Sequence, residues 1–92
     1  MSAVVRKILR EDSVYVKAGR KFAREHGLDK RRTYTLRLAY YDGSSMKRWS
    51  EVPARWTGHA ATVGGSVVAV FVTKDETLIY APLTLVVRKG TR

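Results

Sequence analysis

The chain has 92 residues, enough for one compact domain with a single core. Its 18 Lys and Arg against 8 Asp and Glu give a formal net charge of +10, which indicates a polyanionic partner, nucleic acid before an anionic membrane surface. It contains no cysteine, so disulfides, thiolate nucleophiles and Cys-ligated zinc are excluded, and no apolar run reaches the roughly 18 residues that span a membrane.

The positive charge is concentrated in the first half of the chain. Residues 1–48 contain 13 Lys and Arg against 5 acids, whereas residues 49–92 contain 5 against 3. We therefore expect the anion-facing surface to come from the first half. The absence of Asn and Gln, with 11 Arg against 7 Lys, favours a thermophilic source, with a codon bias as the alternative explanation.

The N-terminal third is predicted to contain two short strands and one helix. Residues 4–9 and 14–16 have the period of strands, and the polar residues 11–13 between them are typical of a turn. Residues 19–26 have no β-branched member, and Gly27 follows them where a left-handed helix C-cap belongs. These residues form the one predicted helix.

A predicted hairpin follows this helix. Residues 34–40 alternate, with two tyrosines and two leucines on the face expected to be buried and Arg37 on the other face. Asp42-Gly43 is typical of a reverse turn. Residues 46–52 then return as a strand that we expect to end at Pro53, because proline cannot donate a hydrogen bond to a ladder.

The rest of the chain is predicted to form three more strands. Residues 67–72 are apolar on both faces, as in a central strand, and residues 74–76 form a turn. Residues 77–80 and 83–87 complete the set, with Pro82 at a bend. The predicted fold is a mostly β, small pseudobarrel of six or seven short strands with one short helix, and residues 1–92 form a single nucleic-acid-binding domain.

Residues 14–38 resemble the AbrB-type swapped-hairpin DNA-binding family. The shared order is a strand, a short helix, the Gly27-Leu28 step and a returning strand over residues 34–38. The family's proline after the first strand is absent around Lys17-Ala18, and its Gly-Asp before the second strand is replaced near Arg31-Arg32. The resemblance implies a DNA-binding barrel.

A related resemblance extends further along the chain, to the plant-type pseudobarrel DNA-binding domains such as those of auxin-response regulators. Phe22-Ala23, Asp42-Gly43 and Trp49 look like the helix, turn and tryptophan-bearing strand of that family. Arg55-Trp56 and residues 65–71 look like its later half, with Ser66 where an acid is usual. Such domains close their barrel within one chain, which implies a folded monomer here, with a homodimer as the alternative.

The candidate nucleic-acid contacts are basic residues of the first half together with one tryptophan. A cation placed on a phosphate releases counterions, so binding weakens as salt rises. A merely solvated surface is the alternative interpretation of each charged run. Trp49 follows two basic residues on a predicted strand and is the candidate for stacking on a base. The candidates are Arg6, Lys7, Arg10, Arg20, Lys21, Arg24, Lys30, Arg31, Arg32, Lys47, Arg48 and Trp49.

The sequence does not indicate catalysis. His26 and His59 have no nucleophile near them in sequence, and Gly64-Gly65-Ser66 lacks the Lys-Ser/Thr ending of a P-loop. We therefore expect no enzymatic activity, no metal, no cofactor and no membrane partner.

The predicted function is that of a basic DNA-binding protein, either a transcriptional regulator or a chromatin-associated architectural protein, which contacts mainly the phosphate backbone of duplex DNA. A cytoplasmic location is expected, and a nucleoid-associated one if the partner is DNA. One alternative is an RNA-binding or ribosome-associated protein. Another class of alternative is a structural or assembly protein of a virus or plasmid.

Overall fold

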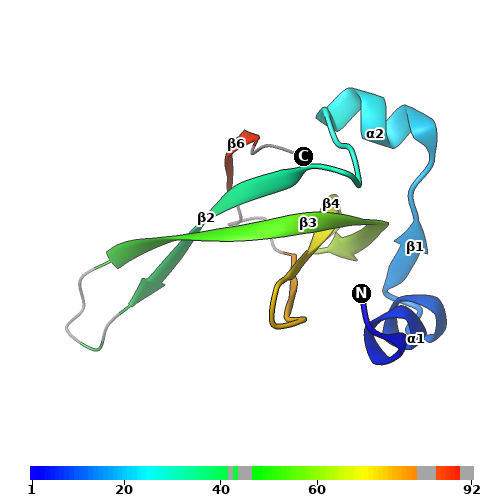
Figure 1. Cartoon of the computed structure of the whole chain (residues 1–92), viewed down its shortest axis with the longest axis horizontal. Helices are drawn as coiled ribbons and strands as arrows, with labels where there is room; N and C mark the ends of the chain where they lie inside the picture. The colour runs from blue at the N-terminus through cyan, green and yellow to red at the C-terminus, as the bar shows by residue number, and fades with distance from the viewer. Residues whose placement is uncertain (42, 44–46, 81–84, 90–92) are drawn as a thin grey trace.

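The computed structural model describes residues 1–41, 43, 47–80 and 85–89 (Figure 1). The described residues form two helices and six strands, in this order: α1 (Ala3–Glu11), β1 (Tyr15–Lys17), α2 (Arg20–His26), β2 (Thr33–Tyr41), β3 (Lys47–Val63), β4 (Ser66–Thr73), β5 (Leu78–Ile79) and β6 (Leu85–Lys89). The prediction of a mostly β fold is confirmed, but the prediction of one helix is wrong, because there are two.

The strands form one antiparallel sheet in the order β5-β4-β3-β2-β6, with β1 paired to β3 off this path. The first part of β3 pairs with β2, from Tyr41↔Lys47 to Thr33↔Arg55. The later part pairs with β1 and, from Ala54 onward, with β4. Strand β3 therefore connects the N-terminal elements to the rest of the sheet.

Strand β3 runs through Pro53, so the prediction that a strand ends at this residue is wrong. Pro53 lies opposite Thr35 of β2, and the ladder with β4 begins only at Ala54. At Pro53 one edge of β3 thus has no partner among the described strands, and a missing N–H is tolerated on such an edge. The proline interrupts no ladder, and the strand continues to Val63.

A bulge interrupts β3 between Trp56 and His59. Trp56 lies opposite Phe71 and His59 opposite Val70, so Thr57 and Gly58 are extra residues on β3. The Thr57 hydroxyl donates to the Val70 carbonyl (2.8 Å) and accepts from the His59 N–H (3.1 Å). Gly58 has φ +84°, a conformation that glycine adopts without strain. The bulge sets the direction of β3 where it meets β1.

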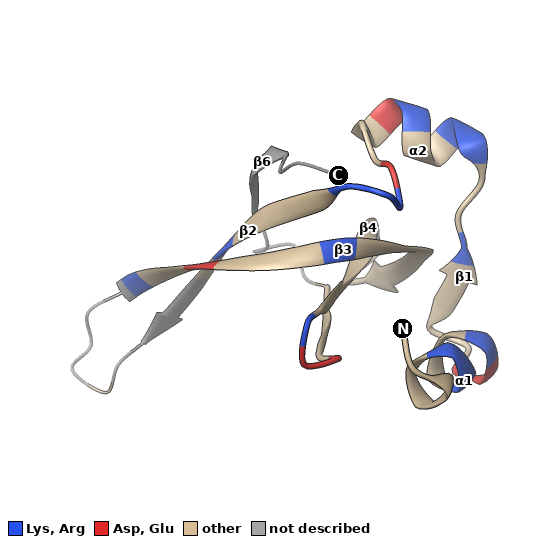
Figure 2. Ribbon diagram, in the orientation of Figure 1, with Lys and Arg blue, Asp and Glu red and all other residues tan. Residues whose placement is uncertain are grey.

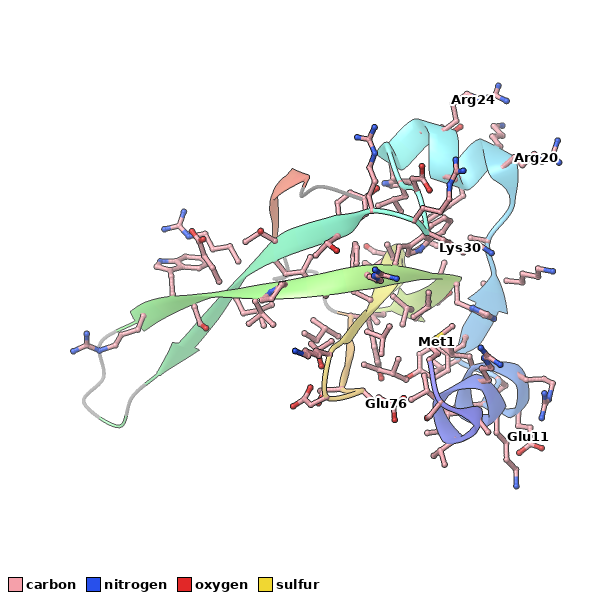
Figure 3. All side chains as sticks on the ribbon, in the orientation of Figure 1. Met1, Glu11, Arg20, Arg24, Lys30 and Glu76 are labelled. Carbon is pink, nitrogen blue, oxygen red and sulfur yellow. The ribbon has the colours of Figure 1, made fainter. Side chains whose placement is uncertain are left out.

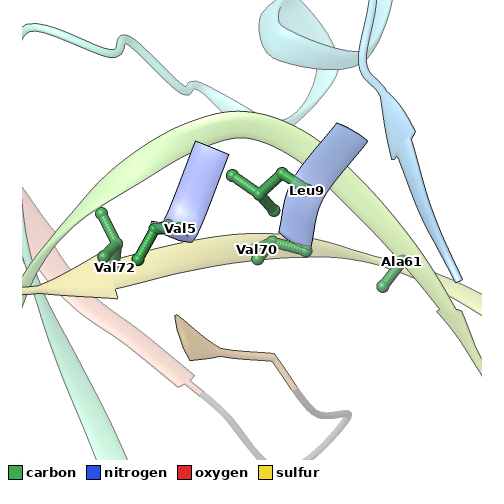
Figure 4. Packing of buried hydrophobic residues seen from close by; sticks show 5 residues of the cluster. All are labelled: Val5, Leu9, Ala61, Val70 and Val72. Carbon is green, nitrogen blue, oxygen red and sulfur yellow. The ribbon is translucent and has the colours of Figure 1, made fainter. Parts of the chain in front are cut away.

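Residues 4–9, predicted as a strand, belong to helix α1, so that prediction is wrong. The Ser2 hydroxyl caps the helix by accepting a hydrogen bond from the Val5 N–H (3.2 Å). Val5 and Leu9 lie one helical turn apart and are buried over β3 and β4, beside Val70 (Figure 4). A spacing of four residues brings two side chains to one face in a strand as well as in a helix, so the periodicity alone could not separate the two.

Helix α2 confirms the predicted helix at residues 19–26, beginning one residue later. Gly27 has φ +64°, and its N–H faces the last carbonyls of the helix, as predicted for the C-cap. Phe22 and Ala23 pack on the second core cluster, which includes the buried Tyr34 and Trp56. His26, the last residue of the helix, is exposed.

The remaining predicted strands are confirmed with shifted ends. Residues 34–40 lie within β2 and residues 67–72 within β4, while residues 14–16 shift by one to become β1. The turn at 74–76 is confirmed, residues 77–80 contain β5, and the described part of the predicted strand 83–87, residues 85–87, lies in β6. Three predicted features lie outside the described residues, namely the turn at Asp42, the strand start at Met46 and the bend at Pro82.

Candidate nucleic-acid interface

The exposed basic residues of the N-terminal elements lie along one end of the molecule. Figure 2 shows Lys and Arg on α1, on β1 and on α2, at the end of the sheet where both helices lie. We call this surface the basic end. It brings together seven cations: Arg6, Lys7 and Arg10 of α1, Lys17 of β1, and Arg20, Lys21 and Arg24 of α2, all exposed. The structure therefore groups six of the predicted contacts and adds Lys17.

The helices present these cations because their apolar residues face the sheet. On α2, Phe22 packs inward, with its ring 6.3 Å from that of Trp56, and Arg20 and Arg24 point away from the sheet (Figure 3). The two arginines lie one turn apart, so they share a face. On α1, Arg6 and Arg10 have the same spacing and flank the buried Leu9.

Few of these cations are neutralised by nearby acids. Lys21 forms an ion pair with Glu25 at 4.0 Å, and Arg31 of the neighbouring loop forms one with Asp29 at 3.5 Å. The Lys21–Glu25 pair is largely exposed, and such pairs contribute little energy. Glu11 of α1 and Glu25 of α2 are the acids on the same helices, and Glu76 of the turn between β4 and β5 shares the lining of a cavity with Met1, just before α1 (Figure 2). The basic end therefore keeps a strong net positive charge.

The loop between α2 and β2 carries the predicted cluster Lys30-Arg31-Arg32. Asp29 shapes this loop, since its carboxylate accepts from the Arg31 N–H (2.9 Å) and its carbonyl from the Arg32 N–H (3.2 Å). The buried Tyr34 holds the base of the loop, because its hydroxyl accepts from the Asp29 N–H (2.7 Å) and donates to the Gly27 carbonyl (3.2 Å). A core tyrosine thus positions a basic loop.

Lys30 connects this loop to the basic end. A Cβ atom added to Gly58 would lie 2.9 Å from the Lys30 Cδ, so the aliphatic stem of Lys30 passes over the bulge of β3. The stem lies between α2 and β1 (Figure 3). Long basic side chains commonly pack their stems on a surface while the charged group reaches solvent. The structure therefore places the Lys30 stem beside Gly58, whose carbonyl accepts from the N–H of Ala18, the residue that follows β1.

The predicted group at residues 47–49 lies elsewhere. Residues 38–41 of β2 and 47–50 of β3 pair only with one another among the described strands, and this ribbon projects from the sheet on the side opposite the two helices (Figure 1). Arg48 and Trp49 are exposed, and the side chain of Lys47 lies outside the described residues. The structure therefore does not bring this group to the basic end.

Trp49 carries a cation over its ring. The Arg37 guanidinium carbon lies 4.5 Å from the ring centroid of Trp49, which is 44% exposed. Arg37 and Trp49 share one face of the ribbon, since Arg37 and Ala39 lie two residues apart and Ala39 lies opposite Trp49. Arg37 is not among the predicted contacts, although its place on the outward face of an alternating strand was the signal that could have identified it.

A pocket at the basic end joins predicted and unpredicted residues. Its volume is about 410 Å³, and Arg6 and Arg10 of α1, Lys17 of β1 and His59 of β3 line it over a floor formed by Leu9 and Tyr15. We call it the basic pocket. Lys17 and His59 face each other in the β1–β3 ladder. The sequence could not reveal this pairing, because the two residues lie far apart in the chain.

Tyr15 on the floor of the basic pocket stays neutral at ordinary pH. Burial raises the pKa of Tyr15 to about 12, and a hydrogen bond with the Tyr80 hydroxyl and the negative charge of Asp12 act in the same direction. The Tyr15 and Tyr80 rings meet edge to face, with centroids 5.5 Å apart. The floor therefore adds no negative charge to the cations around it.

Neither helix in the described part of the chain is long and apolar enough to cross a membrane. Among the same residues, no three His, Cys, Asp or Glu side chains gather where they could hold a metal ion. No protein-family model matches the chain. No curated protein matches it, and no solved structure does.

Proposed function

We propose that this protein binds nucleic acid, duplex DNA foremost, through phosphate contacts made by the basic end and by Lys30, Arg31 and Arg32 of the neighbouring loop. The observation that carries this proposal is the grouping of seven exposed cations from α1, β1 and α2 at one end of the molecule, where the helices themselves carry only the acids Glu11 and Glu25. Phosphate contacts position a protein without reading bases. The role would be that of a transcriptional regulator or of a nucleoid-associated architectural protein.

The arrangement of the helices supports backbone contact over base readout. Arginine and lysine dominate the outer face of α2, and these side chains suit phosphate oxygens. The sequence resembles AbrB-type DNA-binding domains in the order of a helix, the Gly27-Leu28 step and a returning strand. Helix α2 and strand β2 follow one another in this order, which supports the proposal.

The projecting ribbon favours a second candidate, an RNA-binding or ribosome-associated protein. Trp49 is partly exposed and carries the Arg37 guanidinium over its ring. Exposed aromatic rings stack on unpaired bases, and arginine adds a cation–π contribution. If the ribbon is the main contact, single strands should bind more tightly than duplexes, and Trp49 fluorescence should change on binding.

A titration against three nucleic acids separates these candidates. Duplex DNA, single-stranded DNA and duplex RNA of one length are titrated with the whole chain at about 50 and 200 mM salt and followed by fluorescence anisotropy. We expect duplex DNA to bind with a log–log salt slope of about −5 or steeper. A flat salt dependence, or no binding at low salt, would overturn the proposal and favour an assembly protein. Preference for single strands would favour the second candidate.

A further inference from the structure

The basic pocket gathers cations from separate elements and has no acid in its wall. Arg6 and Arg10 come from α1, Lys17 from β1 and His59 from β3, and within the described part of the chain no acidic side chain lines the pocket. A second cavity of about 440 Å³ differs in this respect, because Arg55 and Lys74 share its lining with Glu76. The basic pocket therefore has a lining whose chemistry suits an anion.

The local structure holds these groups in place. Leu9 is 3% exposed and fixes the side of α1 from which Arg6 and Arg10 extend. The β1–β3 ladder places Lys17 opposite His59, and the His59 Nδ1 lies 3.3 Å from the Thr57 carbonyl oxygen at the bulge. The lining groups thus come from α1 and from the paired strands β1 and β3, and not from one solvated run.

The floor strengthens the attraction for an anion. Leu9 and Tyr15 present apolar surface, and Tyr15 is neutral at ordinary pH because burial raises its pKa to about 12. Charges beside apolar walls are screened less than charges in open water. Arginine guanidinium groups also match the paired oxygens of a phosphate.

We propose that the basic pocket binds a phosphate group, and that the terminal phosphate monoester of a nucleic-acid strand fits it better than a backbone diester. A diester carries a single negative charge, whereas a monoester carries about −1.5 to −2 at pH 7. Three permanent cations around one pocket match the larger charge. The lining of the pocket by itself supports the binding of a phosphate group. The assignment of that phosphate to the end of a nucleic-acid strand rests on the proposed function.

The first experiment uses inorganic phosphate and the whole chain. Proton–nitrogen NMR spectra are recorded during titration with sodium phosphate and, separately, with sodium chloride at equal ionic strength. We expect saturable shifts with phosphate only, centred on the amides near Arg10, Lys17 and His59. The variant Arg10→Gln/Lys17→Gln should weaken phosphate binding about tenfold or more, because it removes two charge-assisted contacts.

A matched control removes the same charge outside the pocket. The variant Arg20→Gln/Arg24→Gln lowers the net charge equally but changes α2, whose residues do not line the pocket. It should bind inorganic phosphate as the parent does. Equal weakening in both variants, or phosphate shifts no different from those with chloride, would overturn the proposal. Circular dichroism confirms that each variant is folded, which is expected because all four residues are exposed.

The second experiment identifies the source of the phosphate. Two single strands of one sequence, with a 5′-phosphate or a 5′-hydroxyl, are compared in anisotropy titrations. We expect the 5′-phosphate to tighten binding several-fold in the parent and in the α2 control, and to give no gain in the pocket variant. No gain in the parent would overturn the assignment to a terminal monoester. If phosphate saturates the pocket but duplex DNA does not bind, the proposed function fails while the phosphate site stands.

Discussion

The half-buried Tyr15 and the buried Tyr34 show how single hydroxyl groups connect the core to the basic surface. Tyr34 holds the base of the loop that carries Lys30, Arg31 and Arg32, through its bonds to the Asp29 N–H and the Gly27 carbonyl. Tyr15 lies under the cations of the basic pocket and pairs with Tyr80. In both cases a residue of a predicted strand supports charges that come from other elements.

The raised pKa of Tyr15 predicts a loss of stability at alkaline pH. Burial raises the pKa of Tyr15 to about 12, whereas a tyrosine in an unfolded chain ionises near pH 10. Between these values the folded state keeps a proton that the unfolded state has lost, so this contribution is fully present below about pH 10 and is lost as pH rises towards 12.

The measurement is urea unfolding of the parent and of Tyr15→Phe at several pH values across this window. The comparison between the two proteins separates Tyr15 from all other groups of the chain, which both proteins share. The free energy of unfolding should fall less steeply with pH in Tyr15→Phe than in the parent. Parallel curves would show that Tyr15 ionises in the folded state as it does in the unfolded chain.

At the scale of elements, α1 covers the first core cluster with two of its residues. Leu9 is 3% exposed and packs with Val5, Ala61 and Val70, whereas its neighbour Ile8 is 41% exposed. We expect Leu9→Ala to lower the free energy of unfolding by about 2–5 kcal/mol, because it leaves a cavity over the sheet. Ile8→Ala on the same helix is the matched control and should change it by less than about 1 kcal/mol. Chemical denaturation of both variants measures the two free energies of unfolding. Equal effects would contradict the packing of α1 on β3 and β4.

Helix α2 should contribute affinity without contributing sequence preference. Replacing Arg20 and Arg24 together by Ala should weaken binding about equally for unrelated DNA sequences, because phosphates carry no direct sequence information. The log–log salt slope should become shallower by roughly two. Stability should barely change, since alanine favours helix and exposed charges contribute little. Anisotropy titrations over a range of salt concentrations measure both the affinity and the slope.

Two further variants of matched design complete this test. Arg55→Ala/Lys74→Ala lowers the net charge equally but changes exposed residues outside the basic end, so its salt slope should stay close to that of the parent. Phe22→Ala should instead lower the free energy of unfolding by about 3 kcal/mol, because Phe22 packs on the second core cluster. If the α2 variant binds with the parent's affinity and salt slope, α2 does not contact the nucleic acid. The ribbon that carries Arg48 and Trp49 is then the next candidate for the nucleic-acid contact.

For the whole molecule, we expect a folded monomer. Each helix packs on its own core cluster within one chain, since residues of α1 pack with Val70 and Val72 and residues of α2 with Phe71, on the other face of β4. Strand β5, at one end of the sheet, has only two residues and offers little edge for another chain. Light scattering should therefore give a mass near 10.4 kDa, with the circular dichroism spectrum unchanged on dilution. Loss of folded signal on dilution would show that a second chain completes the fold.

The sequence by itself determined the properties that depend on local pattern or on composition. Net charge and its concentration in the first half follow from counting. The helix ending at Gly27 and the alternation that buries Tyr34 and Leu36 in β2 are local signals, and the structure confirms both. The turn at residues 74–76 was recognised in the same way. In each case neighbouring residues carry all the information that is needed.

Only the tertiary structure decided the rest. Val5 and Leu9 suit a strand or a helix, and packing over β3 and β4 selects the helix. Pro53 would end a strand paired on both edges, but its place before the β4 ladder lets β3 continue. Lys17 meets His59 only because β1 pairs with the far part of β3, which creates the basic pocket. The physical reason is that periodicity specifies which face of an element is buried, while its partner is chosen by contacts between residues distant in the chain.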